Sequence, residues 1–253
     1  MSAVRNTLRH FFCALGYFTR VPIPAWVGYQ SDDLDHAARY FPLVGLLVGL
    51  LAAVVWFVAH LVLPLRVAIL LSMIATIWLT GAFHEDGLAD SVDGLGGGYT
   101  RERMLEIMHD SRIGTFGAVA LLAGLLLKLE TLAALPVAWI APAMIAAHAF
   151  SRLVAASLLA TLDYVRPAGK AKPVATRLAG AGLLVALICG VAALAQLPWQ
   201  WALAALVACL VLRTLVARYL ARTLGGYTGD TLGMTQQLAE LLCYLVWCAC
   251  AFI

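Results

Sequence analysis

The chain has 253 residues, of which 63% are hydrophobic and 12% are charged, and its mean hydropathy is +0.90. A soluble domain is about half apolar and about a quarter charged, so this composition excludes an ordinary soluble protein. It predicts an all-α, polytopic integral membrane bundle. The net charge of +3 is small and dispersed, which argues against a nucleic-acid partner.

The N-terminal segment predicts a helix at the membrane boundary. Residues 7–18 are apolar with basic residues nearby, and we expect an amphipathic or partly inserted helix there. Arg20 and Pro22 interrupt the apolar stretch, and no small-residue cleavage site follows cleanly. We therefore expect no cleavable signal peptide. The cysteines lie mostly in apolar runs without a CxxC pair, so neither a disulfide nor a zinc site is expected.

Seven apolar stretches approach the length of about 20 residues that a bilayer core requires. Pro64, Pro136 and Pro198 fall between stretches, where a helix has to end. Gly45 and Gly49 form a GxxxG spacing that permits close helix packing. We expect residues 1–253 to form a single membrane domain. The expected spans cover residues 41–63, 65–83, 115–135, 137–162, 178–197, 199–221 and 238–253.

Basic residues gather in alternate connections between these spans. Cytoplasmic loops carry the excess of Lys and Arg, which predicts an inner (plasma) membrane protein with its N-terminus in the cytoplasm and its C-terminus outside. Arg66 stands on the outer side, with Lys128 near one end of a span. The inner set is Arg5, Arg9, Arg20, Arg39, Arg101, Arg103, Arg112, Arg166, Lys170, Lys172, Arg177, Arg218 and Arg222.

Four polar groups lie inside the spans, where a charge is costly: His148, Arg152, Arg213 and Glu240. Arg213 and Glu240 are on consecutive spans and can pair in the bundle interior. Snorkelling or helix–helix pairing and a role in the functional site are equally open interpretations.

The acidic residues concentrate in one segment, 84–114, which we expect on the cytoplasmic side. Asp86, Asp90 and Asp93 follow an i, i+4, i+7 spacing that places them within about 60° on one helical face. Such carboxylates repel one another, and a divalent cation removes the repulsion. Oxygen ligands without cysteine or clustered histidine favour Mg²⁺ or Mn²⁺. A helix-dipole interaction explains Asp86 but not the run through Asp93.

Further polar residues flank this segment. Asp110 can add a metal ligand, and Arg112 can clamp a phosphate oxygen. Gly94 begins a glycine-rich run that permits close approach of a ligand or serves as a plain hinge. Asp230, in a late Gly- and Thr-rich cluster, can complete the metal site or act as a base; a simple helix connection is the alternative. Together these groups indicate phosphoryl transfer at a membrane surface.

Five sequence blocks together resemble the cobalamin synthase family, the adenosylcobinamide-GDP ribazoletransferases, over nearly the whole chain. The blocks are FTRVP at 18–22, YFPLVG at 40–45, HEDGLADSVD at 84–93, DSRIGTFG at 110–117 and GYTGD at 226–230. The resemblance implies an Mg²⁺-dependent membrane enzyme. Its substrates would be adenosylcobinamide-GDP and α-ribazole or its 5′-phosphate, and its products adenosylcobalamin (or its phosphate) and GMP. A homo-oligomer is compatible with it.

With these substrates, we assign roles to individual residues as a hypothesis. Asp86, Asp90 and Asp93 would bind the metal, and Asp110, Arg112 and Asp230 would be catalytic, with Asp110 or Asp230 as the base. Residues expected at the substrate are Arg20, His84, Gly94, Gly226 and Thr228.

Two other functions remain alternatives. A CDP-alcohol phosphotransferase of lipid synthesis also carries helical aspartates, but its pattern has an Asp-Gly followed by Ala-Arg, whereas Ala89 here precedes Asp90. A transporter would need charges deep in several spans, whereas the acids here cluster on one side.

Overall fold

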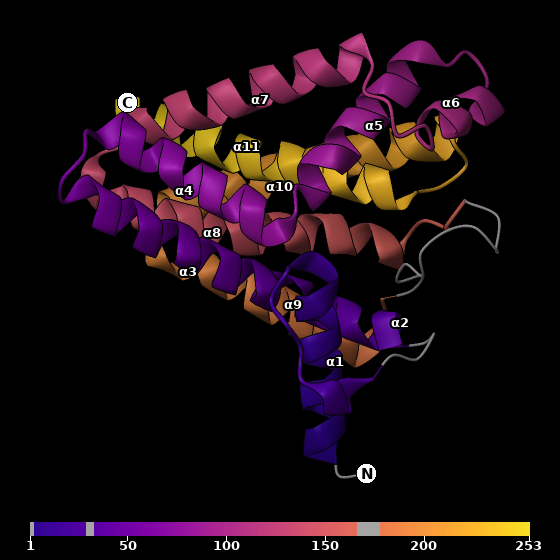
Figure 1. Cartoon of the computed structure of the whole chain (residues 1–253), viewed down its shortest axis with the longest axis horizontal. Coiled ribbons are helices and arrows are strands. Elements are labelled where there is room, and N and C mark those ends of the chain that lie inside the picture. The colour runs from indigo at the N-terminus through magenta and orange to yellow at the C-terminus, as the bar shows by residue number, and fades with distance from the viewer. Residues whose placement is uncertain (1–2, 29–32, 166–177) are drawn as a thin grey trace.

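The computed structural model describes residues 3–28, 33–165 and 178–253, and its regular elements there are helical (Figure 1). One isolated parallel bridge joins Tyr164 and Tyr227. The α-helices are α1 (Ala3–Phe18), α2 (Asp33–Ala37), α3 (Phe41–His60), α4 (Leu65–Thr80), α5 (Phe83–Gly97), α6 (Arg101–Ile107), α7 (Thr115–Ala134), α8 (Val137–Ala156), α9 (Gly180–Ala192), α10 (Trp199–Thr223) and α11 (Gly229–Phe252). Short 3-10 turns cover Ala25–Val27, Ala38–Tyr40, Ser157–Ala160 and Ala193–Gln196.

The predicted polytopic helical membrane bundle is confirmed. In the described part of the chain, five helical stretches are long and apolar enough to cross a bilayer: Asp33–His60, Thr115–Ala134, Val137–Ala160, Trp199–Thr223 and Gly229–Phe252. The bent pair α4 and α5 makes a sixth if it is counted as one span. Each of the seven expected stretches contains a helix, but Leu65–Thr80 alone and Gly180–Gln196 are shorter than the others. The last expected span begins earlier, at Gly229.

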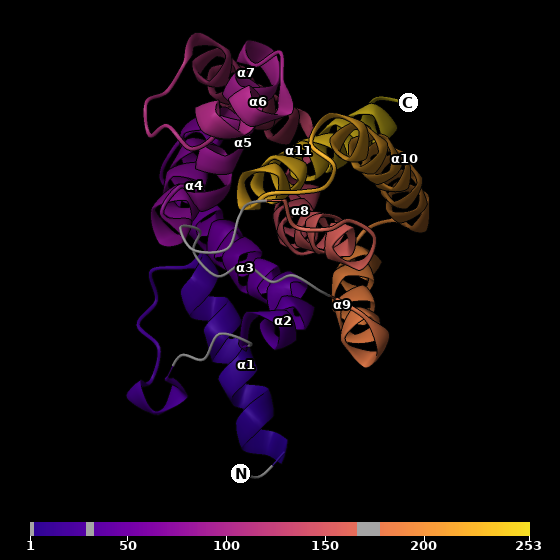
Figure 2. The ribbon, with the colours of Figure 1, turned by 90° about the vertical axis from the view of Figure 1, so that its right-hand side faces the viewer.

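Helix α8 forms the centre of the bundle. Its apolar window is 83% buried, against 22% for α7 and for α10, and it packs on α3 and α11 (Figures 1 and 2). A Cβ atom on Gly49 would lie 2.7 Å from the Ile145 Cα, and one on Gly45 would lie 2.9 Å from the Ala149 Cα. The predicted close packing through these glycines is therefore confirmed, with α8 as the partner of α3.

The chain bends by 85° between α4 and α5. Gly81 and Ala82 adopt left-handed backbone angles, with φ of 65° and 58°, and a left-handed glycine ends helices readily because it has no Cβ. The bend turns the acidic helix α5 away from the apolar course of α4. The expected span 65–83 therefore ends at this break.

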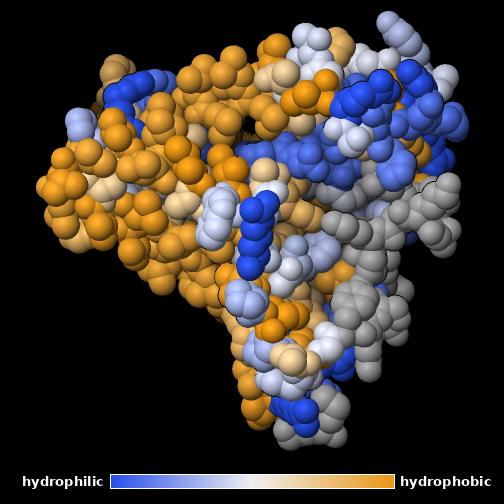
Figure 3. Space-filling model, viewed as in Figure 1, coloured by the Kyte–Doolittle hydropathy of each residue, from blue (hydrophilic) through white to orange (hydrophobic). Residues whose placement is uncertain are grey.

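The surface divides into an apolar body and a polar end. Figure 3 shows hydrophobic residues over the body of the bundle and hydrophilic residues around α5 and α6. Large apolar side chains such as Phe57 and Leu122 are 57% and 62% exposed on the body. Lipid is the solvent that such a surface requires. The polar end is where the candidate site lies.

Candidate active site

The acidic helix α5 packs against the start of α11. A Cβ atom on Gly87 would lie 2.8 Å from the Asp230 carbonyl oxygen and 3.1 Å from the Gly233 Cα. The absence of a side chain at Gly87 and Gly233 thus lets the two backbones meet. This contact brings Asp230 beside the helix that carries Asp86 and Asp90, although about 140 residues separate them in the sequence.

Asp93 is already engaged by protein groups. Its side chain is buried, and its Oδ2 and Oδ1 atoms accept hydrogen bonds from the backbone N–H groups of Gly114 at 2.7 Å and Gly117 at 2.8 Å. These amides lie at the N-terminus of α7, where a carboxylate is favoured by the helix dipole. Asp93 therefore fixes the start of α7 on the end of α5.

The predicted triad does not form a closed metal cage. Within residues 3–28, 33–165 and 178–253, no three His, Cys, Asp or Glu side chains come together as ligands of one ion, because Asp93 is directed at the α7 amides. Asp86 is exposed and Asp90 is half-buried one turn later. Mg²⁺ commonly takes one or two carboxylates and completes its octahedron with water and substrate phosphates. This oxygen-only donor set therefore fits Mg²⁺ held in part by the substrate.

Asp110 and Arg112 form an ion pair. The Arg112 Nη2 lies 2.7 Å from the Asp110 Oδ2, and the Arg112 Nε donates to both carboxylate oxygens at 3.1 Å. These side-chain hydrogen bonds, with one from the Arg112 backbone N–H, lower the pKa of Asp110 to about 2. A carboxylate with so low a pKa is a weak proton acceptor.

A polar cleft connects Asp93 with this ion pair. Its volume is about 430 Å³, and it is lined from α5, α6 and the start of α7. Asp110, Arg112 and Thr115 contribute to its wall, as does Arg103, which pairs with Glu106 at 2.7 Å. A volume of this size lies in the range of small-molecule sites.

Gly94 and Gly226, two predicted substrate residues, have packing roles. A Cβ atom on Gly94 would lie 2.8 Å from the Met104 carbonyl oxygen, so Gly94 lets α6 fold back onto α5. A Cβ atom on Gly226 would overlap the carbonyl oxygen of Asp163, which accepts a hydrogen bond from the Tyr227 N–H at 2.9 Å.

Thr228 caps α11. The Thr231 N–H donates to the Thr228 hydroxyl at 3.2 Å, and the Thr228 N–H donates to the Thr231 hydroxyl at 2.9 Å. This reciprocal capping box is fully buried. It fixes the helix start from which Asp230 projects.

The remaining predicted substrate residues, Arg20 and His84, lie near the α4–α5 bend. The backbone N–H of Arg20 donates to the Leu79 carbonyl at 2.8 Å. The side chain of Arg20 is exposed, and its guanidinium lies next to Gly81. His84 is buried and stacks on Phe18, with ring centroids 5.3 Å apart. The C-terminal end of α1 and the residues after it therefore pack against the α4–α5 bend.

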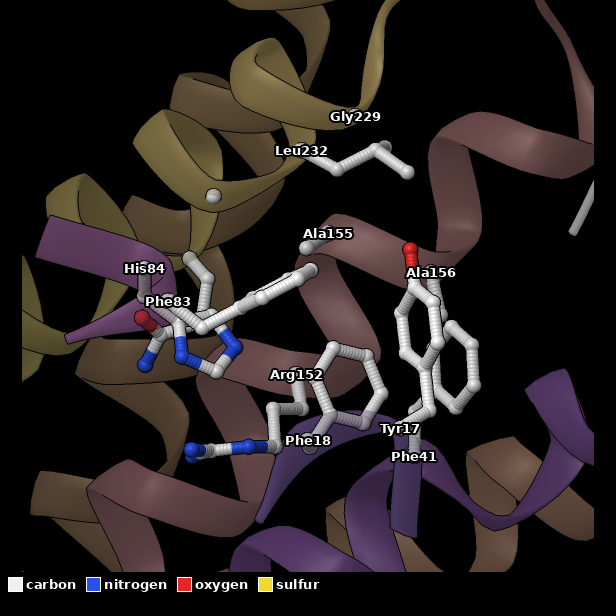
Figure 4. A pocket seen from close by; sticks show the side chains of 12 residues that line it. Tyr17, Phe18, Phe41, Phe83, His84, Arg152, Ala155, Ala156, Gly229 and Leu232 are labelled. Atoms are coloured by element: carbon white, nitrogen blue, oxygen red, sulfur yellow. The ribbon is translucent and has the colours of Figure 1, made fainter. Parts of the chain in front are cut away.

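An aromatic pocket adjoins His84 (Figure 4). It lies among α1, α3, α5, α8 and α11. The sequence did not single it out, because its wall combines residues from five separated segments. Its lining residues are Tyr17, Phe18, Phe41, Phe83, His84, Arg152, Ala155, Ala156, Gly229, Leu232, Gly233 and Gln236.

A buried polar network lies deeper in the bundle. Glu240 pairs with Lys128 at 2.9 Å and accepts a hydrogen bond from Gln236 at 2.7 Å, while the His148 Nδ1 lies 3.4 Å from it. The predicted pairing of Glu240 with Arg213 is wrong: the Arg213 Nε donates instead to the Ser157 hydroxyl at 3.2 Å. The sequence predicts Lys128 near the outer end of a span, whereas the structure buries its side chain inside the bundle, on α7.

Comparison with known proteins identifies the family. A family model described as cobalamin-5-phosphate synthase matches residues 10–248. An adenosylcobinamide-GDP ribazoletransferase of Ralstonia pickettii is 51% identical over 250 residues, covering 98% of this chain and 97% of the relative. The protein of the same name from Shewanella oneidensis is 50% identical over 242 residues, covering 93% and 92%. No solved structure matches the chain.

These matches confirm the resemblance predicted from the five sequence blocks. The family model and the relatives described here are named neither as lipid phosphotransferases nor as transporters. The similarity extends over the acidic segment, the α11 start and the membrane helices alike. This chain belongs to the cobalamin-5-phosphate synthase family.

Proposed function

We propose that this chain transfers the adenosylcobinamide phosphoryl group from adenosylcobinamide-GDP to α-ribazole, or to α-ribazole 5′-phosphate, and releases GMP. The observation that carries the proposal is the identity of about half of all residues with ribazoletransferases over nearly the full length of both chains. The packing of α5 on the start of α11 at the polar end of the bundle supports it, since this contact brings the two acidic segments together.

The reaction requires one bond to form and one to break. A hydroxyl oxygen of α-ribazole attacks the phosphorus nearer the corrinoid, the bond from that phosphorus to the GMP oxygen breaks, and GMP leaves. Asp230 accepts the hydroxyl proton, since the hydrogen bonds from Arg112 make Asp110 a poor acceptor. Asp93 positions the start of α7 through its two amide contacts.

Asp86 and Asp90 on α5 would hold Mg²⁺, which leaves Asp230 on the neighbouring helix as the base. When bound there, this ion supplies positive charge that stabilises the pyrophosphate and its leaving group. Arg112 binds Asp110 through its Nε and Nη2 atoms, and its Nη1 atom takes no part in these hydrogen bonds. It is therefore assigned to a phosphate oxygen, because guanidinium groups bind phosphate well.

The orientation follows from the distribution of basic residues. We place the polar end, with Arg101, Arg103 and Arg112, in the cytoplasm together with the N-terminus, in a plasma membrane. Water-soluble nucleotide substrates then reach the site directly. Four residues of the basic set, Arg166, Lys170, Lys172 and Arg177, lie outside the described residues.

The test is GMP release by the purified protein in liposomes from adenosylcobinamide-GDP and α-ribazole. Release should depend on Mg²⁺ and on α-ribazole, so omission of either is the control. A parallel reaction with CDP-diacylglycerol and a polar alcohol tests the lipid phosphotransferase alternative. CMP release in that reaction, without GMP release in the first, would sink the proposal.

A further inference from the structure

Helix α1 projects sideways from the bundle, near the boundary between its apolar body and its polar end. Figures 1 and 2 show α1 running across the direction of α3 and α8 rather than along it. Its C-terminal end is held at the α4–α5 bend, whereas its N-terminal residues 4–8 are exposed. A helix that crosses the direction of the spanning helices lies along the plane of the membrane.

The two faces of α1 differ in what they contact. One face packs on α2, where the Arg9 Nη2 lies 2.6 Å from the Asp33 Oδ2, and Cys13 on this face is buried. The other face carries an apolar stripe at i, i+4, i+7, i+8 and i+11: Val4, Leu8, Phe11, Phe12 and Leu15. Val4 and Leu8 are 68% and 45% exposed. This end of the stripe therefore faces an apolar partner that the described residues do not supply.

Trp26 adds to the stripe from the 3-10 turn Ala25–Val27. Its side chain is 40% exposed, and its ring meets that of Phe12 edge-on, with centroids 6.0 Å apart. The Arg5 guanidinium lies over the same ring, 5.6 Å from its centroid. The Arg9 Nε donates to the Val27 carbonyl at 2.9 Å, so the turn and the helix form one unit. One open groove of about 380 Å³ is lined by Val4, Arg5, Leu8 and Trp26.

This combination of residues is typical of the boundary between lipid and water. Tryptophan concentrates there because its ring is apolar and carries one polar N–H. An arginine beside it, such as Arg5, can keep its stem in the apolar layer and extend its guanidinium to phosphate groups. Figure 3 shows hydrophobic residues along one edge of the protrusion formed by α1, below the hydrophobic body of the bundle. The lipid that surrounds the body is therefore the partner that covers the stripe.

We propose that α1 and the turn Ala25–Val27 form an anchor that lies in the plane of the membrane, on the side that carries the polar end. Val4, Leu8 and Trp26 enter the upper part of the acyl layer. Arg5 binds the phosphates of phospholipid headgroups. Phe18, at the other end of α1, packs on Phe83 of α5 with ring centroids 5.5 Å apart. The anchor therefore fixes the acidic helix relative to the membrane surface, and it is independent of the reaction at the site.

Quenching of Trp26 by brominated phosphatidylcholine, with the full chain in nanodiscs, tests the depth of this anchor. The Trp26 signal is the difference in fluorescence between wild type and Trp26→Phe. Bromines at the headgroup end of the acyl chains should reduce this signal about twofold or more, and bromines near the terminal methyl should reduce it less. Trp78 is 68% exposed on α4. Its signal, obtained with Trp78→Phe, should be quenched in the same discs and is the positive control.

A matched pair of substitutions tests which face of α1 meets the lipid. Leu8→Glu places a charge in the acyl layer and should raise amide hydrogen exchange across residues 3–18 about tenfold, the effect of losing the burial of one leucine. Asn6→Glu changes another exposed residue, about 160° around the same helix. It should leave the exchange unchanged. Mass spectrometry of both variants in nanodiscs measures the difference.

Each experiment has an outcome that overturns the anchor. A Trp26 signal that neither bromolipid reduces would place the ring outside the lipid. Equal exchange in Leu8→Glu and Asn6→Glu would show that the stripe is not the buried face. Protection of residues 3–18 only in discs that hold two copies of the chain would assign the stripe to a second copy instead. GMP release in the same discs reports separately on the proposed function.

Discussion

Lys128 on α7 and Glu240 on α11 form an ion pair of 2.9 Å inside the helix bundle, where their side chains are 9% and 1% exposed. Gln236 and Tyr244 also donate hydrogen bonds to this carboxylate. Because the two charges pair with each other and the carboxylate accepts further hydrogen bonds, the bundle tolerates them in its apolar interior. The pair ties the helix that follows the acidic segment to the helix that carries Asp230.

Removal of both members of this pair should cost less stability than the sum of the two single removals. Lys128→Met leaves an uncompensated carboxylate in the interior and should destabilise the protein by about 3–5 kcal/mol. The double variant Lys128→Met with Glu240→Met should lose less than the sum of the two single effects. Thermal unfolding in detergent micelles measures all three. Strictly additive losses would show that the pair is not coupled.

Close contact between α5 and α11 should be sensitive to a single methyl group. Gly87→Ala places a Cβ atom 2.8 Å from the Asp230 carbonyl oxygen, and we expect a loss of about 1–3 kcal/mol together with loss of activity. Gly124→Ala is the matched control, because its Cβ atom would be 3.9 Å from the nearest atom of Leu88. That variant should be unchanged or more stable by up to about 1 kcal/mol.

Asp93 and Asp86 should respond differently to the same substitution. Asp93→Asn replaces one acceptor facing the amides of Gly114 and Gly117 with a donor, so it should lower stability by about 1–3 kcal/mol. Asp86→Asn, on an exposed carboxylate, should leave the unfolding temperature unchanged and raise the Mg²⁺ concentration required for half-maximal turnover. Equal unfolding temperatures for the two variants would contradict the role assigned to Asp93.

The ion pair of Asp110 and Arg112 predicts a defined pH window. The pKa of Asp110 in the folded protein, about 2, is below its ordinary value of 3.8 because Arg112 donates to the carboxylate. Its stabilising contribution is therefore present above about pH 4 and is lost as the pH falls toward 2. The difference in unfolding temperature between wild type and Asp110→Asn should be constant from pH 5 to 8 and shrink below pH 4. A difference that changes between pH 5 and 8 would contradict the assignment.

The helical membrane bundle could be predicted from sequence because lipid imposes long apolar helices bounded by Pro64, Pro136 and Pro198. The break at Gly81 and Ala82 was not predicted, since Phe83 continues the apolar run without a composition change. As a result, one expected span is shorter than anticipated and the acidic helix turns aside from it.

The candidate site was predictable in composition and only partly in geometry. The i, i+4, i+7 spacing correctly predicted three aspartates on one helix. It could not predict the hydrogen bonds to Asp93, because the amides that donate them belong to another helix, α7. The motif glycines Gly94 and Gly226 are predicted at the substrate, and their close packing on Met104 and Asp163 could not be predicted from the sequence. Isolated polar residues in apolar helices, such as Lys128 and Gln236, were the available signal for the buried network.

The most direct test of the account compares GMP release by wild type with release by the double variant Asp86→Asn with Asp90→Asn, both in liposomes. Wild type should release GMP from adenosylcobinamide-GDP only with Mg²⁺ and α-ribazole present. The variant should keep its unfolding temperature and lose turnover on the order of 100-fold or more. A folded variant with near wild-type turnover, or a wild type without GMP release, would contradict the account.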